Sequence, residues 1–229
     1  MPITRRTARP KLRGLRAPRP TAAEEVAELL RGNIFEGDLP PGTTLPEVAV
    51  AEQYKVSRNT VREAFRILTN DRFLEYEAHK GVAVRTLTPA DVEDIYKVRK
   101  LVELPAIKLL KTGGNLLTAL RERVEAAEQL AAEGKWREAG TENLNFHLRL
   151  ATAHESDRID GIFETIMTEM RLGFLTLGDP EELHGPYLKR NREIYNLLVA
   201  DETEQARTSL RLYLDDAEKQ VKAALSPHD

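Results

Sequence analysis

The chain has 229 residues, of which 41% are hydrophobic and 31% charged, and it contains no cysteine. This length allows one large domain or two modest ones, and the missing cysteines exclude disulfides and thiolate metal sites. No apolar run approaches the roughly 20 residues of a membrane helix, and no apolar segment follows the charged N-terminus. We therefore expect a soluble protein of the cytoplasm, with no membrane partner and no secretory signal.

Residues 1–20 form a basic arm. They carry seven Lys and Arg side chains and no acid, and since the whole chain has a net charge of −3, the rest carries −10. Four prolines keep this arm extended, and we expect it to be disordered. Two interpretations stay open: a solvated tail, or a segment that touches an anionic partner such as DNA.

A first helix is predicted over residues 21–35. Thr21 is a suitable N-cap, and Glu24 lies three positions later, as in a capping box. The glycines and prolines of residues 37–42 then break the chain.

A short second helix is predicted over residues 47–54, with Val48, Val50 and Ala51 facing inward. Only a few residues separate it from a third helix that begins after Ser57. Two helices joined by so short a turn are typical of a helix-turn-helix.

The third helix, within residues 56–68, has two unlike faces. Ser57 can cap it by accepting a backbone N–H of the first turn. The spacing of its apolar residues predicts one buried face, made of Val61, Ala64, Phe65 and Leu68.

The opposite face of this helix carries polar and basic groups near its N-terminus. Arg58 and Arg62 are four residues apart and therefore lie on one side. A helix that enters the major groove of DNA reaches base edges and phosphates with such residues. We predict DNA contacts from Ser57, Arg58, Asn59, Thr60 and Arg62.

Residues 73–77 and 81–85 alternate between polar and apolar side chains and are joined by a turn. This pattern predicts a two-stranded hairpin, or wing. The hairpin is either a structural ribbon or a second contact to DNA. We favour contact between DNA phosphates and Lys80 and Gly81 at its tip.

A second domain is predicted to begin near Thr88 and Pro89, which suit an N-cap and the first position of a helix. The pattern is then helical to the end, over residues 89–111, 115–133, 135–154, 157–177, 181–200 and 202–225. A net charge of −7 makes residues 87–229 a poor nucleic-acid surface, so this part should bind another ligand or itself.

The predicted fold is therefore mainly α. A winged helix-turn-helix over residues 21–86 follows the arm, and about six helices occupy residues 87–229.

The motifs at 34–42, 45–47, 56–64 and 80–81 together resemble the GntR family of bacterial transcription regulators, in the FadR-like subgroup with an FCD-type C-terminal domain. The family usually has Thr-Pro where this chain has Asn59-Thr60, and often Arg in place of Val48. We therefore expect operator contacts that differ from those common in the family.

The C-terminal half carries the resemblance at Asp91, Val98-Arg99, Glu103 and residues 143–147. The resemblance implies an antiparallel helical bundle over residues 87–229 that encloses a small effector, and a homodimer that binds a palindromic operator. Two recognition helices about 34 Å apart read a longer site than one helix can. The expected function is that of a sequence-specific repressor controlled by a small molecule, with an organic acid as the expected effector.

Many FCD domains have a four-ligand metal site, whose positions correspond here to Asn143, His147, Asn191 and Tyr213. One imidazole, two amides and a protonated phenol form a poor divalent site, so we expect neither a metal nor another cofactor. His147 is the sole remaining candidate ligand. These four side chains are predicted instead to hydrogen-bond the effector, and Arg99 to bind its carboxylate.

Several alternatives remain. Arg99 and Glu103, four residues apart, can form a structural salt bridge, and the pocket can have become plain core. The regulator can use a metal-dependent effector site around His147, or bind nucleic acid with no effector. His154 and His184 are expected to be exposed or capping residues at helix ends. An enzyme is not expected, because no nucleophile motif or phosphate loop is present.

Overall fold

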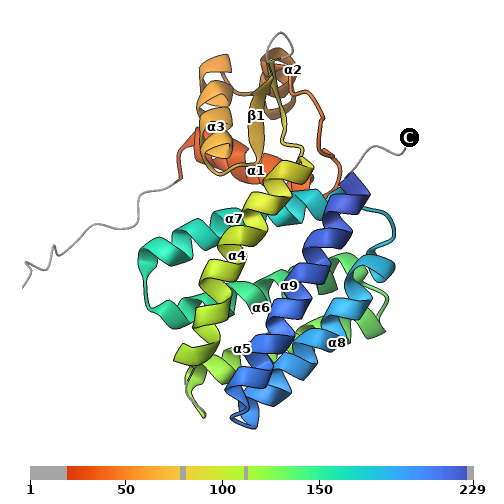
Figure 1. The fold of residues 1–229 in the computed structure, drawn as a ribbon. Coiled ribbons are helices and arrows are strands. Elements are labelled where there is room, and N and C mark those ends of the chain that lie inside the picture. Colours follow the sequence, from red (N-terminus) through yellow and green to blue (C-terminus); the bar gives the residue numbers. More distant parts are fainter. Residues whose placement is uncertain (1–19, 78–80, 111–112, 226–229) are drawn as a thin grey trace, which may run out of the picture.

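The computed structural model describes residues 20–77, 81–110 and 113–225, which form a mainly helical protein in two parts (Figure 1). A small N-terminal part lies at one end of a larger helical bundle. The N-terminal elements are α1 (Ala22–Glu36), α2 (Glu47–Tyr54), α3 (Arg58–Asn70), β1 (Leu74–Glu77) and β2 (Gly81–Val84). The bundle consists of α4 (Pro89–Leu109), α5 (Asn115–Ala132), α6 (Trp136–Ala151), a 3-10 turn (Thr152–His154), α7 (Asp157–Leu175), α8 (Pro180–Val199) and α9 (Thr203–Leu225).

Helix α1 begins with the predicted capping box. The Thr21 hydroxyl accepts the backbone N–H of Glu24, and the Glu24 carboxylate accepts the backbone N–H of Thr21. Gly37 ends the helix with a φ of 88°, a left-handed conformation that glycine adopts without a steric penalty. Both ends of α1 therefore lie within one residue of the predicted range, 21–35.

The helix-turn-helix is confirmed in α2 and α3. Ser57 caps α3 by accepting the backbone N–H of Thr60 at 3.1 Å, and the predicted apolar face of α3 is buried. The prediction that Val48 faces inward is wrong, since this residue is 50% exposed. Helix α2 has only two turns, and it buries Val50 and Ala51 instead.

The predicted wing is an antiparallel hairpin. Leu74 pairs with Val84, and Glu77 pairs with Gly81. A single bridge between Thr44 and Ala83 ties the hairpin to the segment before α2. Lys80 lies outside the described residues, so its predicted phosphate contact stays a prediction.

The bundle begins with another capping box, in which Thr88 and Asp91 cap each other around Pro89. Its helices follow the prediction closely, except that the third one ends in a 3-10 turn from Thr152 to His154. Helices α4, α8 and α9 lie side by side on the face nearest the viewer in Figure 1, with α5, α6 and α7 behind them. Within the described ranges, no helix combines the length and the apolar character needed to cross a membrane.

Helix α7 joins the two parts. Its Leu172 is fully buried in the core formed by α1, α3 and the wing. Arg85, just after β2, forms ion pairs with Asp91 at 3.0 Å and with Glu169 of α7 at 3.2 Å. The N-terminal part is therefore packed on the bundle through both apolar and charged contacts.

Candidate functional site

The N-terminus of α3 holds two exposed arginines against one glutamate. The Nε of Arg62 donates to both carboxylate oxygens of Glu47 at 2.9 Å, and Nη2 of Arg58 lies 3.3 Å from the same group. The Arg58 and Arg62 side chains remain 59% and 55% exposed. The hydrogen bond from Arg62, with help from Arg58, holds the pKa of Glu47 below its usual value despite slight desolvation.

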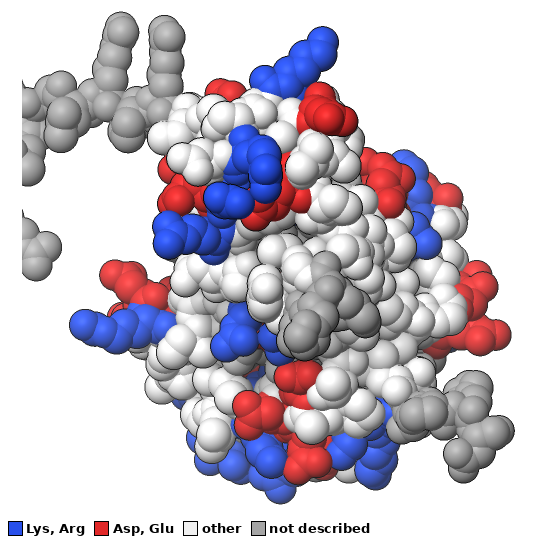
Figure 2. Space-filling view, turned by 90° about the horizontal axis from the view of Figure 1, so that it is seen from above, with Lys and Arg blue, Asp and Glu red and all other residues white. Residues whose placement is uncertain are grey.

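Basic groups on this end of the molecule lie beside acidic ones. Viewed from the end that carries α1–α3, Lys and Arg form small clusters next to Asp and Glu, with no continuous basic patch (Figure 2). The described part of this surface thus offers a few hydrogen-bond donors in set positions rather than a broad region of positive potential. Such a surface favours specific contact over non-specific attraction to nucleic acid.

The bundle encloses a buried triad of Arg99, Glu103 and His147. Nε of Arg99 donates to Glu103 at 2.8 Å, and the other Glu103 oxygen lies 2.5 Å from Nδ1 of His147. Burial favours a neutral Glu103, but the charge of Arg99 and the hydrogen bonds hold the pKa of this carboxyl below its usual value. Burial lowers the pKa of His147, so its neutral ring donates from Nδ1 and leaves the Nε2 lone pair free.

A second buried group centres on Asn143. Its side-chain oxygen accepts a hydrogen bond from Asn191 Nδ2 at 2.5 Å and from the Tyr213 hydroxyl at 3.0 Å. The Tyr213 ring lies 4.8 Å from the His147 ring, which joins the two groups. The structure therefore brings all five predicted pocket residues together, counting Arg99, in the centre of the bundle.

The cavity beside these residues is small, with a volume of about 10 Å³. This is about the space that one water molecule needs. Three fully buried atoms of these five residues have no hydrogen-bond partner among the described residues: Arg99 Nη2, His147 Nε2 and Asn191 Oδ1. One of these unpaired atoms is a hydrogen-bond donor and two are acceptors, so the cluster is unlike a plain apolar core.

These residues do not fit a divalent metal. No group of three or more His, Cys, Asp and Glu side chains that could hold an ion occurs among the residues described. The amides of Asn143 and Asn191 bond each other, and burial raises the pKa of Tyr213, which keeps its phenol protonated. Of the four residues at the family's metal-site positions, His147 is therefore the one that suits a divalent metal.

Two residues that matter to the bundle were missed or misplaced by sequence reasoning. Tyr96, one turn before Arg99, lies under its guanidinium at 4.9 Å, and the spacing of three residues was the available signal. His184 was expected at a helix end, exposed or capping, and this was wrong. Its side chain is only 5% exposed, packed on Phe174 and on the bare face of Gly140.

Comparison with known proteins decides the family. The model of the family "Bacterial regulatory proteins, gntR family" matches residues 22–84, and that of the FCD domain matches residues 94–216. The chain belongs to the GntR family, with an FCD domain. Members of this family are transcriptional regulators, and the predicted family and fold class are thereby confirmed.

Similar proteins are also described as transcriptional regulators. A crystal structure of a putative transcriptional regulator GntR from Rhodococcus sp. RHA1 is 39% identical and has a TM-score of 0.83, covering 88% of this chain and 98% of that one. A probable D-xylose utilization operon transcriptional repressor of Paenarthrobacter nicotinovorans is 29% identical over 75% of this chain and 79% of its own. The uncharacterized regulator YdhC of Bacillus subtilis is 34% identical over 46% of this chain, a match that spans about half of YdhC.

Proposed function

We propose that this GntR-family regulator is a sequence-specific repressor that binds a palindromic operator as a homodimer and responds to a small organic acid. Residues 21–86 form the DNA-reading unit in this proposal, and residues 87–229 form the effector-binding and dimerisation unit. The observation that carries the DNA-binding part is the capped N-terminus of α3, which presents two half-exposed arginines.

The Glu47 pairs support this assignment because they orient the arginines without burying them. A guanidinium that is more than half exposed can exchange a carboxylate for a phosphate or a guanine edge at little cost in desolvation. Arg62 lies one turn beyond Arg58 on the same face, so both can face one groove. Asn59 and Thr60 are exposed or half-buried beside them and complete the predicted reading surface.

The orphaned atoms in the bundle support a hydroxy acid as the effector. A carboxylate can accept from the free Nη2 of Arg99, and a hydroxyl can donate to the lone pairs of His147 Nε2 or Asn191 Oδ1. The cavity in this structure is smaller than such a ligand, so the acid binds only with an outward shift of the helices around it. That shift gives the effector a means to bias the rest of the molecule.

Helix α7 supports a route from the bundle to the DNA-reading unit. Leu172 lies in the core of that unit, and Glu169, one turn earlier, pairs with Arg85 of the linker. Burial raises the pKa of Glu169 above its usual value, although Arg85 and Arg72 oppose this. A movement of α7 therefore changes contacts on both sides of the linker, as coupling between two sites requires.

The experiment is selection from a random library of 30-base-pair duplexes with the full chain. Wild type should enrich one palindromic motif, and Arg58→Ala and Arg62→Ala should each weaken binding to that motif roughly tenfold to a hundredfold, because each removes a base or phosphate contact. Arg121→Ala on α5 is the control, since it removes an exposed arginine that also pairs with a glutamate. Equal binding of random and selected DNA by wild type, or unchanged binding by both variants, would refute the proposal.

A further inference from the structure

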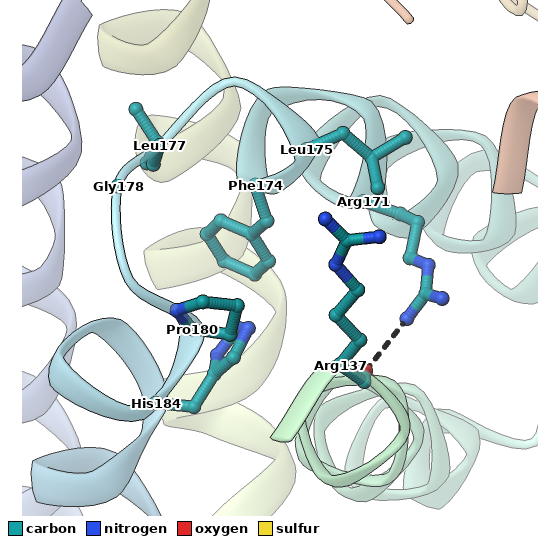
Figure 3. Close-up of a pocket in the computed structure, with 8 residues that line it drawn as sticks. All are labelled: Arg137, Arg171, Phe174, Leu175, Leu177, Gly178, Pro180 and His184. Atoms are coloured by element: carbon teal, nitrogen blue, oxygen red, sulfur yellow. Dashed lines mark hydrogen bonds between the residues drawn. The ribbon is translucent and has the colours of Figure 1, made fainter. Parts of the chain in front are cut away.

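A second crevice lies where the bundle meets the N-terminal part, and it shares Phe174 and His184 with the lining of the bundle cavity. It is bordered by the start of α6, the end of α7 and the start of α8 (Figure 3). Arg137 rises from α6 toward Phe174, and Arg171 reaches down from α7 to the backbone of α6. Pro180 and His184 form the wall on the α8 side.

The two arginines of this crevice have no acidic partner. Among the described residues, no carboxylate oxygen lies within 4.0 Å of either guanidinium. Nη1 of Arg171 donates to the backbone oxygen of Arg137 at 3.1 Å and to the Thr141 hydroxyl. Burial lowers the pKa of Arg171, the charge of Glu138 opposes this in part, and the charge of Arg137 lowers the pKa further. Two cations on one side of a crevice without a counter-charge favour an anion.

His184 adds a polar group to the same wall. Its ring is nearly buried, and the structure gives it no hydrogen bond within the described ranges. Gly140 on α6 makes room for it, since a Cβ at that position would lie 2.3 Å from Nε2 of His184. The glycine therefore lets the imidazole pack closely against α6 at the wall of the crevice.

The size of the crevice limits the ligand. Its volume is about 40 Å³, room for roughly three water molecules. A tetrahedral oxyanion has this size, and arginine presents paired N–H groups that match its oxygens.

We propose that Arg137, Arg171 and His184 bind a small oxyanion of the phosphate or sulfate type, at a ligand site that contains no residue of the Asn143 cluster. The site touches the DNA-reading unit. Nη1 of Arg137 lies 3.5 Å from the backbone oxygen of Glu36, and Arg171 lies over the ring of Phe35 at 5.5 Å. An anion that draws the arginines into the crevice therefore acts on the C-terminal end of α1.

The single tryptophan of the chain, Trp136, lies next to Arg137 in sequence and against Gly185 of α8. Titration of the full chain with inorganic phosphate should change its fluorescence and show saturation, with calorimetry as a second measurement. Sulfate should compete, and chloride at equal ionic strength should not.

Arg137→Ala should weaken phosphate binding at least tenfold, because it removes one cation whose only described hydrogen bond is the long one to Glu36. Arg171→Lys, which keeps the charge, should weaken it less. Arg211→Ala removes an exposed arginine from α9 and is the charge-matched control. Asn191→Ala, which alters the Asn143 cluster, should bind phosphate as wild type does, so this site can fail or stand without the proposed effector site.

Two results would overturn the proposal. One is a wild-type protein with no saturable response to phosphate or sulfate. The other is an Arg137→Ala variant that melts like wild type and binds phosphate equally well.

Discussion

An arginine faces a glutamate in both parts of the protein, but water reaches only one of these pairs. On the DNA-reading unit, Arg62 and Glu47 meet at 2.9 Å with side chains that are 55% and 29% exposed. In the bundle, Arg99 and Glu103 meet at 2.8 Å with exposed fractions of 2% and 0%. The distances are alike, so the difference lies in solvation.

This difference separates a replaceable contact from a fixed one. An exposed pair contributes little to folding, so Arg62 can leave Glu47 for another anion. A buried pair has lost its hydration, and removing one partner leaves the other charge stranded. The pair of Arg62 and Glu47 therefore suits a binding surface, whereas the pair of Arg99 and Glu103 suits a fixed position inside the bundle.

The largest expected effect comes from Glu103→Gln. It should lower the free energy of unfolding by about 3–5 kcal/mol, because Arg99 is left as an uncompensated buried charge. Denaturant unfolding measures this at neutral pH. Glu125→Gln, which disrupts an exposed pair with Arg121, should cost less than about 1 kcal/mol.

The pH dependence of wild type checks the same contact. The lowered pKa of Glu103 means that its contribution is complete above the unfolded value of 4.5 and is lost as the pH falls through the folded value. If Glu103→Gln and Glu125→Gln destabilise equally, the triad has no special role.

A medium effect is expected from a hydroxy acid in the bundle cavity. Lactate or gluconate at one hundred times its dissociation constant should stabilise wild type by about 2.7 kcal/mol, while D-xylose, which lacks a carboxylate, should not. Asn191→Ala should weaken the response, since it removes one orphaned acceptor, and Asn196→Ala on the exposed side of α8 should not. Thermal melting measures all three proteins. An acid response that survives Asn191→Ala unchanged would place the effector elsewhere.

The sequence predicts the local features of this fold, but not which buried side chains pair. Caps and apolar spacing are local, so the sequence predicts the helices, the short turn between α2 and α3, and the wing within about two residues. The pocket side chains were placed together through the family resemblance. Which of them would pair was left open, because Arg99 could face either Glu103 or a ligand, and only packing decides this.

His184 shows where local reasoning ends. Its position depends on Gly140, 44 residues earlier, whose missing side chain leaves room for the ring. Neither residue carries a local signal for this contact. Val48 is a simpler case, in which a short helix offered three apolar residues and had room to bury two.

The smallest expected effect comes from Val48→Arg, which tests the exposed side of the comparison. Val48 is half exposed on α2, next to Glu47, and the family often has arginine at this position. A new arginine there should reach a DNA phosphate and steepen the slope of log K against log salt by about 0.9, since one more counterion is released. Val199→Arg, on an equally exposed valine of α8, adds the same charge far from α3 and should leave the slope unchanged. If both variants changed the slope alike, the steeper slope would come from net charge and not from a contact at position 48. A change for Val48→Arg alone would show that the exposed face around Glu47 meets the DNA backbone.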